Sequence, residues 1–190
     1  MGVVIRLGRR TGRREGAVMS SPSSWLVQHA GLLPREGRAL DVASGRGRHA
    51  LWLAARGLTT LAVDRDADAI RELNQAAREH GLPLRAEVRD LEDGGSPFRG
   101  STYDVIVVVH YLHRPLFPVL IDAVAPGGLL VYETFTRAQA ARGKPTNPDF
   151  LLKAGELLEL VRPLEVLASR EGDFDGRMIA SVIARRGSAV

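Results

Sequence analysis

The sequence predicts an α/β protein built on a doubly wound, mostly parallel sheet of seven strands that ends in an antiparallel hairpin. Apolar runs alternate with amphipathic segments through residues 38–134, which is typical of strands and helices that alternate along a chain. The run 103–109 (YDVIVVV) is apolar almost throughout, as expected for a parallel strand buried on both faces. Two apolar segments flank a turn at residues 171–176, and this arrangement predicts the terminal hairpin.

The same patterns place each element in order. A serine-rich start followed by Trp25 predicts a short helix at residues 25–29. The expected strands are residues 38–42, 59–63, 84–88, 103–109, 129–134, 164–168 and 178–184. The expected longer helices are residues 48–56, 66–80, 116–124 and 155–161, with loops at residues 92–101 and 137–149 and a turn at residues 126–128. Gly57 and Gly81 follow two of the helices, where glycine favours termination.

Net charge divides the chain into a basic leader and a neutral remainder. Residues 1–18 hold five arginines and one glutamate, a net charge of +4, and the whole chain also has a formal net charge of +4. Residues 19–190 therefore sum to zero, which does not favour nucleic-acid binding through a broad cationic face. A chain of 190 residues predicts one domain. We therefore expect a disordered basic leader at residues 1–19 and a single domain at residues 20–190.

The patterns that the sequence lacks exclude several classes of site. There is no cysteine, which excludes disulfides, thiolate metal sites and cysteine nucleophiles. The histidines and acids show no spacing typical of metal ligands, so no metal is expected. No apolar run approaches the roughly 20 residues of a membrane-spanning helix, and the start lacks the apolar core of a secretory signal. These absences predict a cytoplasmic protein without a membrane partner, and no pattern indicates its oligomeric state.

Acidic residues end the predicted second and third strands, close to a glycine-rich turn after the first. The turn lies within residues 40–50 (LDVASGRGRHA), where Gly45 and Gly47 allow a ligand to approach the backbone closely. Asp64 ends the second strand, where a carboxylate can accept hydrogen bonds from both ribose hydroxyls, and Asp90 ends the third. Each acid alone is equally compatible with a solvated loop or a helix cap. Because the carboxyl ends of parallel strands meet at one edge, the set predicts one binding site.

This ordered series resembles the motifs of class I S-adenosylmethionine-dependent methyltransferases, whose Rossmann-like sheet is closed by an antiparallel pair. The resemblance covers about residues 38–134 and rests on residues 41–47, Asp64, Asp90-Leu91, Tyr103-Asp104 and residues 126–128. Within the class, the short chain and residues 45–49 (GRGRH) are most similar to small tellurite-resistance-type methyltransferases. The family pattern has glycine where this chain has Ala43, and alanine suits that position only where φ is negative.

The resemblance implies that the cofactor is S-adenosylmethionine and the product S-adenosylhomocysteine. The implied cofactor contacts lie in and after the first four strands. They are Asp41, Ala43, Gly45 and Gly47 for the methionine part, Asp64 for the ribose, Arg65, Asp90 and Leu91 for the adenine, and Val109 or His110 after the fourth strand.

Candidates for substrate contacts gather mainly after the predicted fourth and fifth strands. His110 and His113 are candidate general bases because histidine titrates near neutrality, and the alternative for both is a hydrogen-bonded structural histidine. The candidate residues that contact the substrate are Trp25, Tyr111, Arg114, Glu133 and Arg170. Core packing, a structural ion pair or simple solvation remains the alternative for these side chains.

The sequence thus predicts methyl transfer to a small-molecule acceptor by in-line displacement, a reaction that needs alignment and exclusion of water more than proton transfer. The motif series without an added recognition domain favours a small acceptor. Three alternatives remain open. They are an RNA methyltransferase that uses the basic leader, an NAD-dependent oxidoreductase that shares the glycine turn and Asp64, and a cofactor-binding protein without catalysis.

Overall fold

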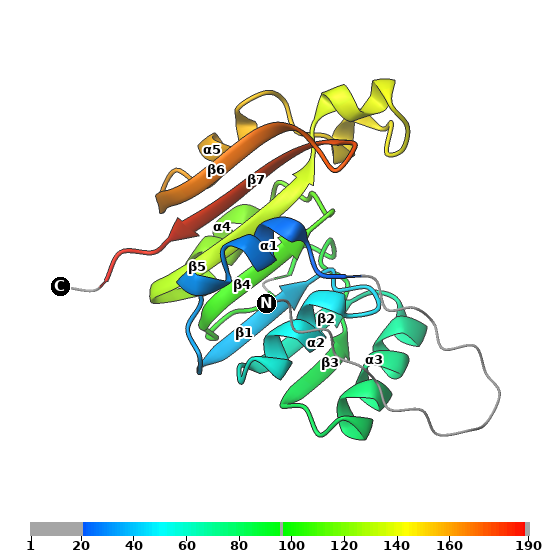
Figure 1. Cartoon of the computed structure of the whole chain (residues 1–190), viewed down its shortest axis with the longest axis vertical. Coiled ribbons are helices and arrows are strands. Elements are labelled where there is room, and N and C mark those ends of the chain that lie inside the picture. Colours follow the sequence, from blue (N-terminus) through cyan, green and yellow to red (C-terminus); the bar gives the residue numbers. More distant parts are fainter. Residues whose placement is uncertain (1–20, 96, 189–190) are drawn as a thin grey trace.

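A seven-stranded sheet forms the centre of the protein in a computed structural model that describes residues 21–95 and 97–188 (Figure 1). The strands are β1 (Arg38–Val42), β2 (Thr59–Asp64), β3 (Leu84–Val88), β4 (Tyr103–Val109), β5 (Val124–Phe135), β6 (Glu165–Phe174) and β7 (Arg177–Arg185). Their order across the sheet is β3-β2-β1-β4-β5-β7-β6. The first five strands pair in parallel, whereas β7 is antiparallel to both β5 and β6. The predicted fold class, including the terminal hairpin, is confirmed.

Helices cover both faces of the sheet, as a doubly wound arrangement requires (Figure 1). One face carries α1 (Ser24–Gln28), α2 (Arg48–Ala55) and α3 (Ala67–Glu79). The other face carries α4 (Leu116–Ala123) and α5 (Glu156–Leu160). The described residues also form three short 3-10 helices, η1 (Ala30–Leu32), η2 (Arg137–Ala141) and η3 (Pro148–Phe150).

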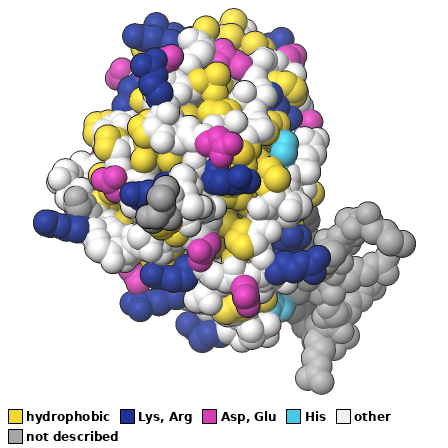
Figure 2. All heavy atoms as spheres, turned by 90° about the vertical axis from the view of Figure 1, so that its left-hand side faces the viewer, with side chains coloured by type: hydrophobic (Ala, Val, Ile, Leu, Met, Phe, Trp, Pro, Cys, Tyr) yellow, Lys and Arg dark blue, Asp and Glu magenta, His cyan; other side chains and the backbone are white. Residues whose placement is uncertain are grey.

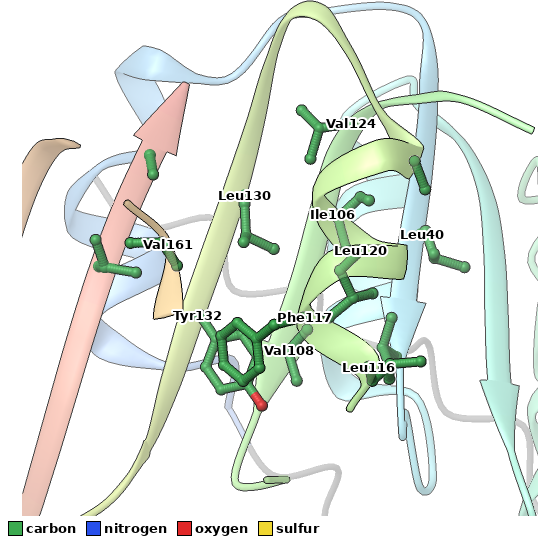
Figure 3. Packing of buried hydrophobic residues seen from close by; sticks show 14 of the residues in the cluster. Leu40, Ile106, Val108, Leu116, Phe117, Leu120, Val124, Leu130, Tyr132 and Val161 are labelled. Atoms are coloured by element: carbon green, nitrogen blue, oxygen red, sulfur yellow. The ribbon is translucent and has the colours of Figure 1, made fainter. Parts of the chain in front are cut away.

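The larger core cluster lies between the sheet and α4 (Figure 3). Phe117 of α4 stacks on Tyr132 of β5, with ring centroids 4.7 Å apart and an angle of 25° between the rings. The buried Tyr132 hydroxyl donates a hydrogen bond to the backbone carbonyl of Tyr111 at 2.8 Å. The core therefore fixes the chain that leaves β4, which is the segment that carries several candidate site residues.

The parallel register brings the carboxyl ends of β1 to β4 together at one edge of the sheet. Val42, at the end of β1, pairs with Val63 on one side and with Val108 on the other. Asp64, at the end of β2, pairs with Val88 at the end of β3. The segments that follow these four strands consequently lie side by side, where ligands bind in open α/β sheets.

β5 begins five residues earlier than the expected strand at residues 129–134. The residues expected to form a turn, 126–128, instead form an irregularity within the strand, where the pairing of β4 and β5 shifts register after Tyr103. Gly127 has φ +76° and donates a backbone hydrogen bond to Arg186 at 2.9 Å. A Cβ on Gly128 would lie 2.9–3.1 Å from three backbone carbonyl oxygens. The glycines thus allow a close backbone approach rather than a chain reversal.

The terminal hairpin is longer and its turn tighter than expected. β6 runs to Phe174, beyond the expected strand at residues 164–168, because alternating polar residues continue the edge strand. The turn consists of Asp175 and Gly176 alone, with φ of +54° and +74°, as a two-residue turn with both central φ values positive requires. The expected loop at residues 137–149 also contains η2 and the start of η3.

Three expectations concern features beyond the fold. The expected leader at residues 1–19 lies outside the described residues. Within residues 21–95 and 97–188, no helix is long and apolar enough to cross a membrane. The same described residues contain no group of three or more His, Cys, Asp or Glu side chains that could hold a metal ion.

Candidate functional site

The glycine-rich turn after β1 has a left-handed backbone at three positions. The φ angles are +54° at Ala43, +53° at Gly45 and +76° at Gly47. A Cβ at Gly47 would lie 2.4 Å from the side chain of Leu73, so this glycine also allows α3 to pack against the turn. Ala43 therefore does not have the negative φ that alanine prefers, and its backbone is strained at this position.

Asp64 connects the turn to the end of β2. Its Oδ2 accepts a hydrogen bond from the backbone N–H of Gly45 at 2.7 Å, and its Oδ1 accepts one from the N–H of Asp66 at 2.9 Å. The side chain of Asp66 in turn caps α3 through the N–H groups of Asp68 and Ala69. The half-buried Asp64 carboxylate is thus held in place with oxygen lone pairs remaining for a ligand.

A pocket of about 350 Å³ opens at this edge of the sheet. Its lining after β1 to β3 comprises Ala43, Asp64, Arg65, Arg89, Asp90, Leu91 and Glu92. Its lining after β4 and β5 comprises His110, Tyr111, Leu112, Phe135, Pro145 and Phe150. The structure therefore brings together eight predicted site residues from four separate segments of the chain, which are Ala43, Asp64, Arg65, Asp90, Leu91, His110, Tyr111 and, by its bond to Asp64, Gly45.

Asp41 lies beneath the turn with an unusual carboxyl group. The side chain is 1% exposed, its Oδ2 accepts a hydrogen bond from the backbone N–H of Ala50 at 2.9 Å, and its Oδ1 has no partner among the described residues. Burial raises the pKa of Asp41 to about 7, although the bond from Ala50 and the nearby Arg48 oppose the rise. The hydroxyl of Ser44 in the same turn is likewise buried without a partner in the described part of the chain.

His49 lies beside Asp41 as a neutral imidazole. Its Nε2 accepts a hydrogen bond from the backbone N–H of Ser23 at 3.2 Å, so the ring hydrogen is on Nδ1, 4.0 Å from Asp41 Oδ1. Burial, followed by the charge of Arg48, lowers the pKa of His49 to about 3. His49 therefore carries no charge at neutral pH, so it does not supply a positive charge that would stabilise an ionised Asp41.

His110 is the side chain that borders the pocket directly after β4. It has φ +61°, and its backbone N–H donates to the carbonyl of Glu133 at 2.8 Å. Its ring stacks on Phe135 with centroids 4.6 Å apart and 22° between the planes. Burial, followed by the charges of Arg48 and Arg177, lowers the pKa of His110 to about 4. At neutral pH His110 is uncharged, so it is able to accept a hydrogen bond but is a weak base.

Tyr111, the next residue, closes the pocket toward β3. Its hydroxyl donates to Glu92 Oε1 at 3.2 Å, and burial raises the pKa of this phenol above its usual value. Asp90 accepts the backbone N–H of Glu92 at 2.9 Å, which fixes the loop after β3. Leu91 is buried and borders the pocket as an apolar surface.

Arg114 does not border the pocket, and its guanidinium donates four hydrogen bonds within the protein. Its Nε and Nη2 donate to the Glu156 carboxylate at 2.6 and 2.9 Å. It also donates to the carbonyls of Asp149 and Leu151 at 2.9 and 3.0 Å. In this structure Arg114 fastens the chain between η3 and α5, and its predicted substrate contact stays a prediction. His113 and Val109 also lie outside the pocket lining.

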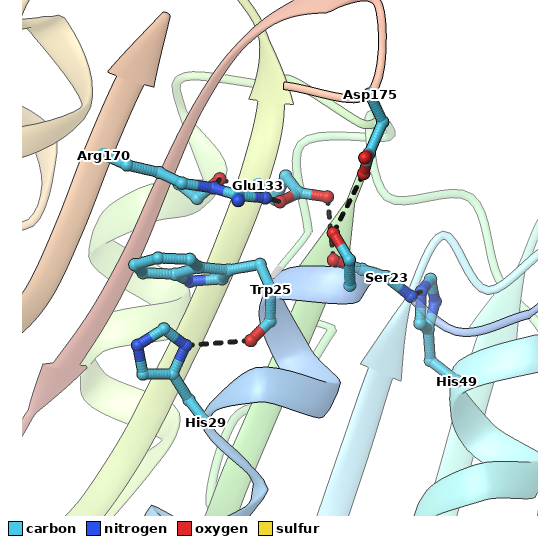
Figure 4. A network of polar contacts seen from close by, with 9 residues as sticks. Ser23, Trp25, His29, His49, Glu133, Arg170 and Asp175 are labelled. Atoms are coloured by element: carbon cyan, nitrogen blue, oxygen red, sulfur yellow. Dashed lines mark hydrogen bonds and ion pairs between the residues drawn. The ribbon is translucent and has the colours of Figure 1, made fainter. Parts of the chain in front are cut away.

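Three further predicted substrate residues, Trp25, Glu133 and Arg170, meet in one buried network outside the pocket lining (Figure 4). Glu133 accepts hydrogen bonds from the hydroxyls of Ser23 and Ser181, both at 2.8 Å, and from Arg170 at 3.1 Å. The Arg170 guanidinium lies 4.8 Å from the ring centroid of Trp25. These side chains hold α1 and the hairpin against β5.

Sequence reasoning did not identify the apolar side of the pocket. Phe135 ends β5, and its position after a predicted strand was a usable signal. Pro145 belongs to the expected polar loop at residues 137–149, and Phe150 directly follows it. Nothing in the composition of this stretch indicates which side chains turn toward the site. Arg89 and Glu92 were likewise not singled out, although they flank the predicted Asp90 and Leu91.

Comparison with known proteins gives a consistent result. Residues 39–128 match a family model described as a methyltransferase domain. The chain is 34% identical over 121 residues to protein-L-isoaspartate O-methyltransferase of Xanthomonas euvesicatoria, a match that covers 61% of this chain and 51% of the relative. The chain thus spans about half the length of the curated relatives that it matches.

Solved structures show the same fold. TehB from Haemophilus influenzae has a TM-score of 0.74 at 20% identity, over 87% of this chain and 62% of that protein. An S-adenosylmethionine-dependent methyltransferase from Mesorhizobium loti has a TM-score of 0.69 at 18% identity, over 88% of this chain and all of that protein. The predicted resemblance is confirmed by the match of residues 39–128 to a methyltransferase domain and by the fold that the chain shares with these solved structures.

Proposed function

We propose that the protein transfers a methyl group from S-adenosylmethionine to a small-molecule acceptor by in-line displacement. The observation that carries this proposal is the convergence of the turn at Ala43, of Asp64 and of Asp90-Leu91 on one pocket of about 350 Å³. The end of β1 offers a strained turn, the end of β2 a carboxylate, and the segment after β3 a carboxylate and an apolar surface to one ligand. These groups match the parts of an adenosine-containing cofactor.

The side chains that line the pocket fit the adenosine part of S-adenosylmethionine. Asp64 has free lone pairs for the ribose hydroxyls, while Asp90 and Leu91 offer an acceptor and an apolar surface to the adenine. Beneath the turn, Asp41 Oδ1 and Ser44 Oγ are buried without partners among the described residues. Neither residue lines the pocket, but unpartnered buried polar atoms are costly, so a ligand ammonium and carboxylate that reached beneath the turn would satisfy them.

The chemistry asks little of the protein beyond binding and alignment. When bound, S-adenosylmethionine supplies a methyl group activated by a sulfonium. The neutral His110 is placed to accept a hydrogen bond from a protonated nucleophile, and with its lowered pKa it orients the acceptor more than it removes a proton. The proton of the acceptor leaves to His110 or to water.

A small acceptor is preferred to the protein substrates named for the curated relatives. The relatives are isoaspartate methyltransferases, but the match covers only half of their length. For the RNA alternative, Figure 2 shows Lys and Arg side chains interspersed with Asp and Glu on the face that it displays. That face has no broad cationic stripe of the kind that phosphate backbones require.

Calorimetric titration with S-adenosylhomocysteine tests the proposal. We expect micromolar binding by the full chain and a loss of at least about tenfold in affinity for Asp64→Asn, which keeps the side-chain shape but removes its charge. Asp68→Asn is the matched control, because this exposed acid lies on α3 outside the pocket, and its affinity should not change. Binding of NADH in place of S-adenosylhomocysteine would contradict the proposal and favour the oxidoreductase alternative.

A further inference from the structure

The two ends of the pocket differ in chemistry. Every charged side chain that lines it in the described part of the chain follows β2 or β3, namely Asp64, Arg65, Arg89, Asp90 and Glu92. The end formed after β4 and β5 is lined instead by His110, Tyr111, Leu112, Phe135, Pro145 and Phe150. The charged end suits the hydrogen-bonding groups of an adenosine, so the second end is left for the acceptor.

We propose that this second end binds an uncharged, planar aromatic molecule as the methyl acceptor. The inference rests on the proposed function, since it assumes that the cofactor fills the charged end. Four of these six side chains carry aromatic rings that can stack on an aromatic ligand. The other two, Leu112 and Pro145, are apolar. Aromatic rings in contact stabilise one another beyond the area that they bury.

The aromatic side chains are arranged for such a guest. His110 and Phe135 already form a stack with centroids 4.6 Å apart, and both border the pocket. Phe150 borders the same pocket and is 51% exposed, one of the few large apolar side chains in the described residues that remain so open. A planar apolar guest placed between them would remove Phe150 from water, which stabilises the complex in proportion to the area covered.

The two arginines that line the pocket, Arg65 and Arg89, lie at its charged end, and Arg89 is paired with Glu87. The arginines closer to the acceptor end do not offer a free charge to an anionic acceptor. Arg114 is paired with Glu156 and Arg170 with Glu133. The charges of Arg48 and Arg177 act on His110, but neither side chain lines the pocket. A carboxylate bound beside Phe135 would lose its water without gaining an ionic partner, which is unfavourable.

The wall of this subsite is held by backbone bonds and side-chain anchors. The carbonyl of Phe135 accepts the N–H of Leu152 at 2.9 Å, and Gln139 Nε2 donates to the carbonyl of Lys144 at 3.2 Å. Arg114 fastens the residues on both sides of Phe150, as its bonds to the carbonyls of Asp149 and Leu151 show. The subsite is therefore largely formed before a ligand arrives, which lowers the cost of binding.

Binding of a matched pair of probes to the full chain saturated with S-adenosylhomocysteine tests the inference. The probes are 2-naphthol, which is uncharged at pH 7, and 2-naphthoate, which has the same rings and one negative charge. We expect calorimetry to show 2-naphthol binding at least about tenfold more tightly than 2-naphthoate. Phe150→Ala, at an exposed position that tolerates truncation, should weaken 2-naphthol by about fivefold, as should Phe135→Ala.

The control is Leu158→Ala, which truncates an exposed apolar side chain on α5 outside the pocket and should leave probe binding unchanged. Equal or tighter binding of 2-naphthoate, or unchanged 2-naphthol binding by Phe150→Ala and Phe135→Ala, would overturn the inference. Absence of 2-naphthol binding to protein that does bind S-adenosylhomocysteine would also overturn it while leaving the proposed function intact. Failure to bind S-adenosylhomocysteine at all would contradict the proposed function itself.

Discussion

Asp41 combines complete burial with a carboxyl oxygen that lacks a partner, and this makes its ionisation sensitive to a ligand. Burial raises the pKa in the folded chain from 3.8 to about 7. Because the folded state then holds the proton more tightly than the unfolded state, Asp41 ionisation disfavours folding as pH rises from about 4 through about 7. A cation bound at Oδ1 lowers the pKa of Asp41 again, because it favours the ionised carboxylate.

The affinity for S-adenosylhomocysteine should therefore rise with pH. If binding requires ionised Asp41, the dissociation constant should fall by about tenfold between pH 6 and pH 8, with release of one proton near pH 6. Calorimetry at several pH values in two buffers of different ionisation enthalpy measures both quantities. Asp41→Asn should abolish the pH dependence, and a persistent pH dependence in that variant would assign it to another group.

Ala43 stands where the methyltransferase pattern that the sequence resembles has glycine, and its φ of +54° makes alanine costly there. A left-handed backbone costs a non-glycine residue about 1–2 kcal/mol, whereas the extra freedom of glycine in the unfolded chain costs about 0.4–1 kcal/mol. The strain is the larger effect. Ala43→Gly should therefore raise the free energy of unfolding by about 0.5–1 kcal/mol, as measured by urea denaturation.

Ala76→Gly is the matched control for this substitution. Ala76 lies within α3, where glycine in place of alanine should lower the free energy of unfolding by about 1 kcal/mol. The two substitutions are chemically identical and should have opposite effects on stability. A loss of stability in both variants would show that the backbone at Ala43 is not strained.

At the scale of elements, the Glu133 network joins α1 and the hairpin to the end of β5 (Figure 4). The Glu133 and Arg170 side chains are only 5% and 14% exposed, so removal of one leaves the other as a buried, unpaired charge. Arg170→Met should lower the free energy of unfolding by about 3 kcal/mol. Urea denaturation measures the loss, and Arg162→Met, which breaks an exposed pair with Glu159, should change stability little.

A second substitution separates charge from packing in this network. Adding Glu133→Gln to Arg170→Met removes the uncompensated charge while keeping a group that hydrogen-bonds to Ser23 and Ser181. The double variant should recover most of the stability that Arg170→Met loses. If the double variant is less stable than the single one, the loss comes from Arg170 packing on the aromatic rings.

The accuracy of the sequence-based predictions differed between elements for physical reasons. Strands such as β4 and helices such as α3 carry a strong local periodicity, and both lie where it predicts them. The start of β5 depends instead on pairing partners distant in sequence, so residues 126–128 resemble a free turn until β4 and Arg186 are placed. The length of β6 was underestimated because an exposed edge strand with alternating polar residues resembles a loop.

For the whole molecule, topology explains which part of the candidate site was predictable. Parallel strands must end at one edge, so the approach of Asp64 and Asp90 to the glycine turn follows from element order alone. Sequence does not reveal whether a polar side chain faces a pocket or a buried partner. Arg114 and Glu133 were candidates for substrate contact for that reason. In the structure the charge of Arg114 is paired with Glu156, and that of Glu133 with Arg170.

The central claim is that one cofactor binds across the carboxyl edge of the sheet, and hydrogen exchange of the full chain with and without S-adenosylhomocysteine tests it most directly. We expect slower amide exchange in four segments that follow the parallel strands, residues 43–47, 64–66, 89–92 and 110–112. Exchange at the opposite edge, in residues 34–37, 56–58 and 80–83, should not change. Protection at the opposite edge, or its absence from all four carboxyl-edge segments, would contradict the account.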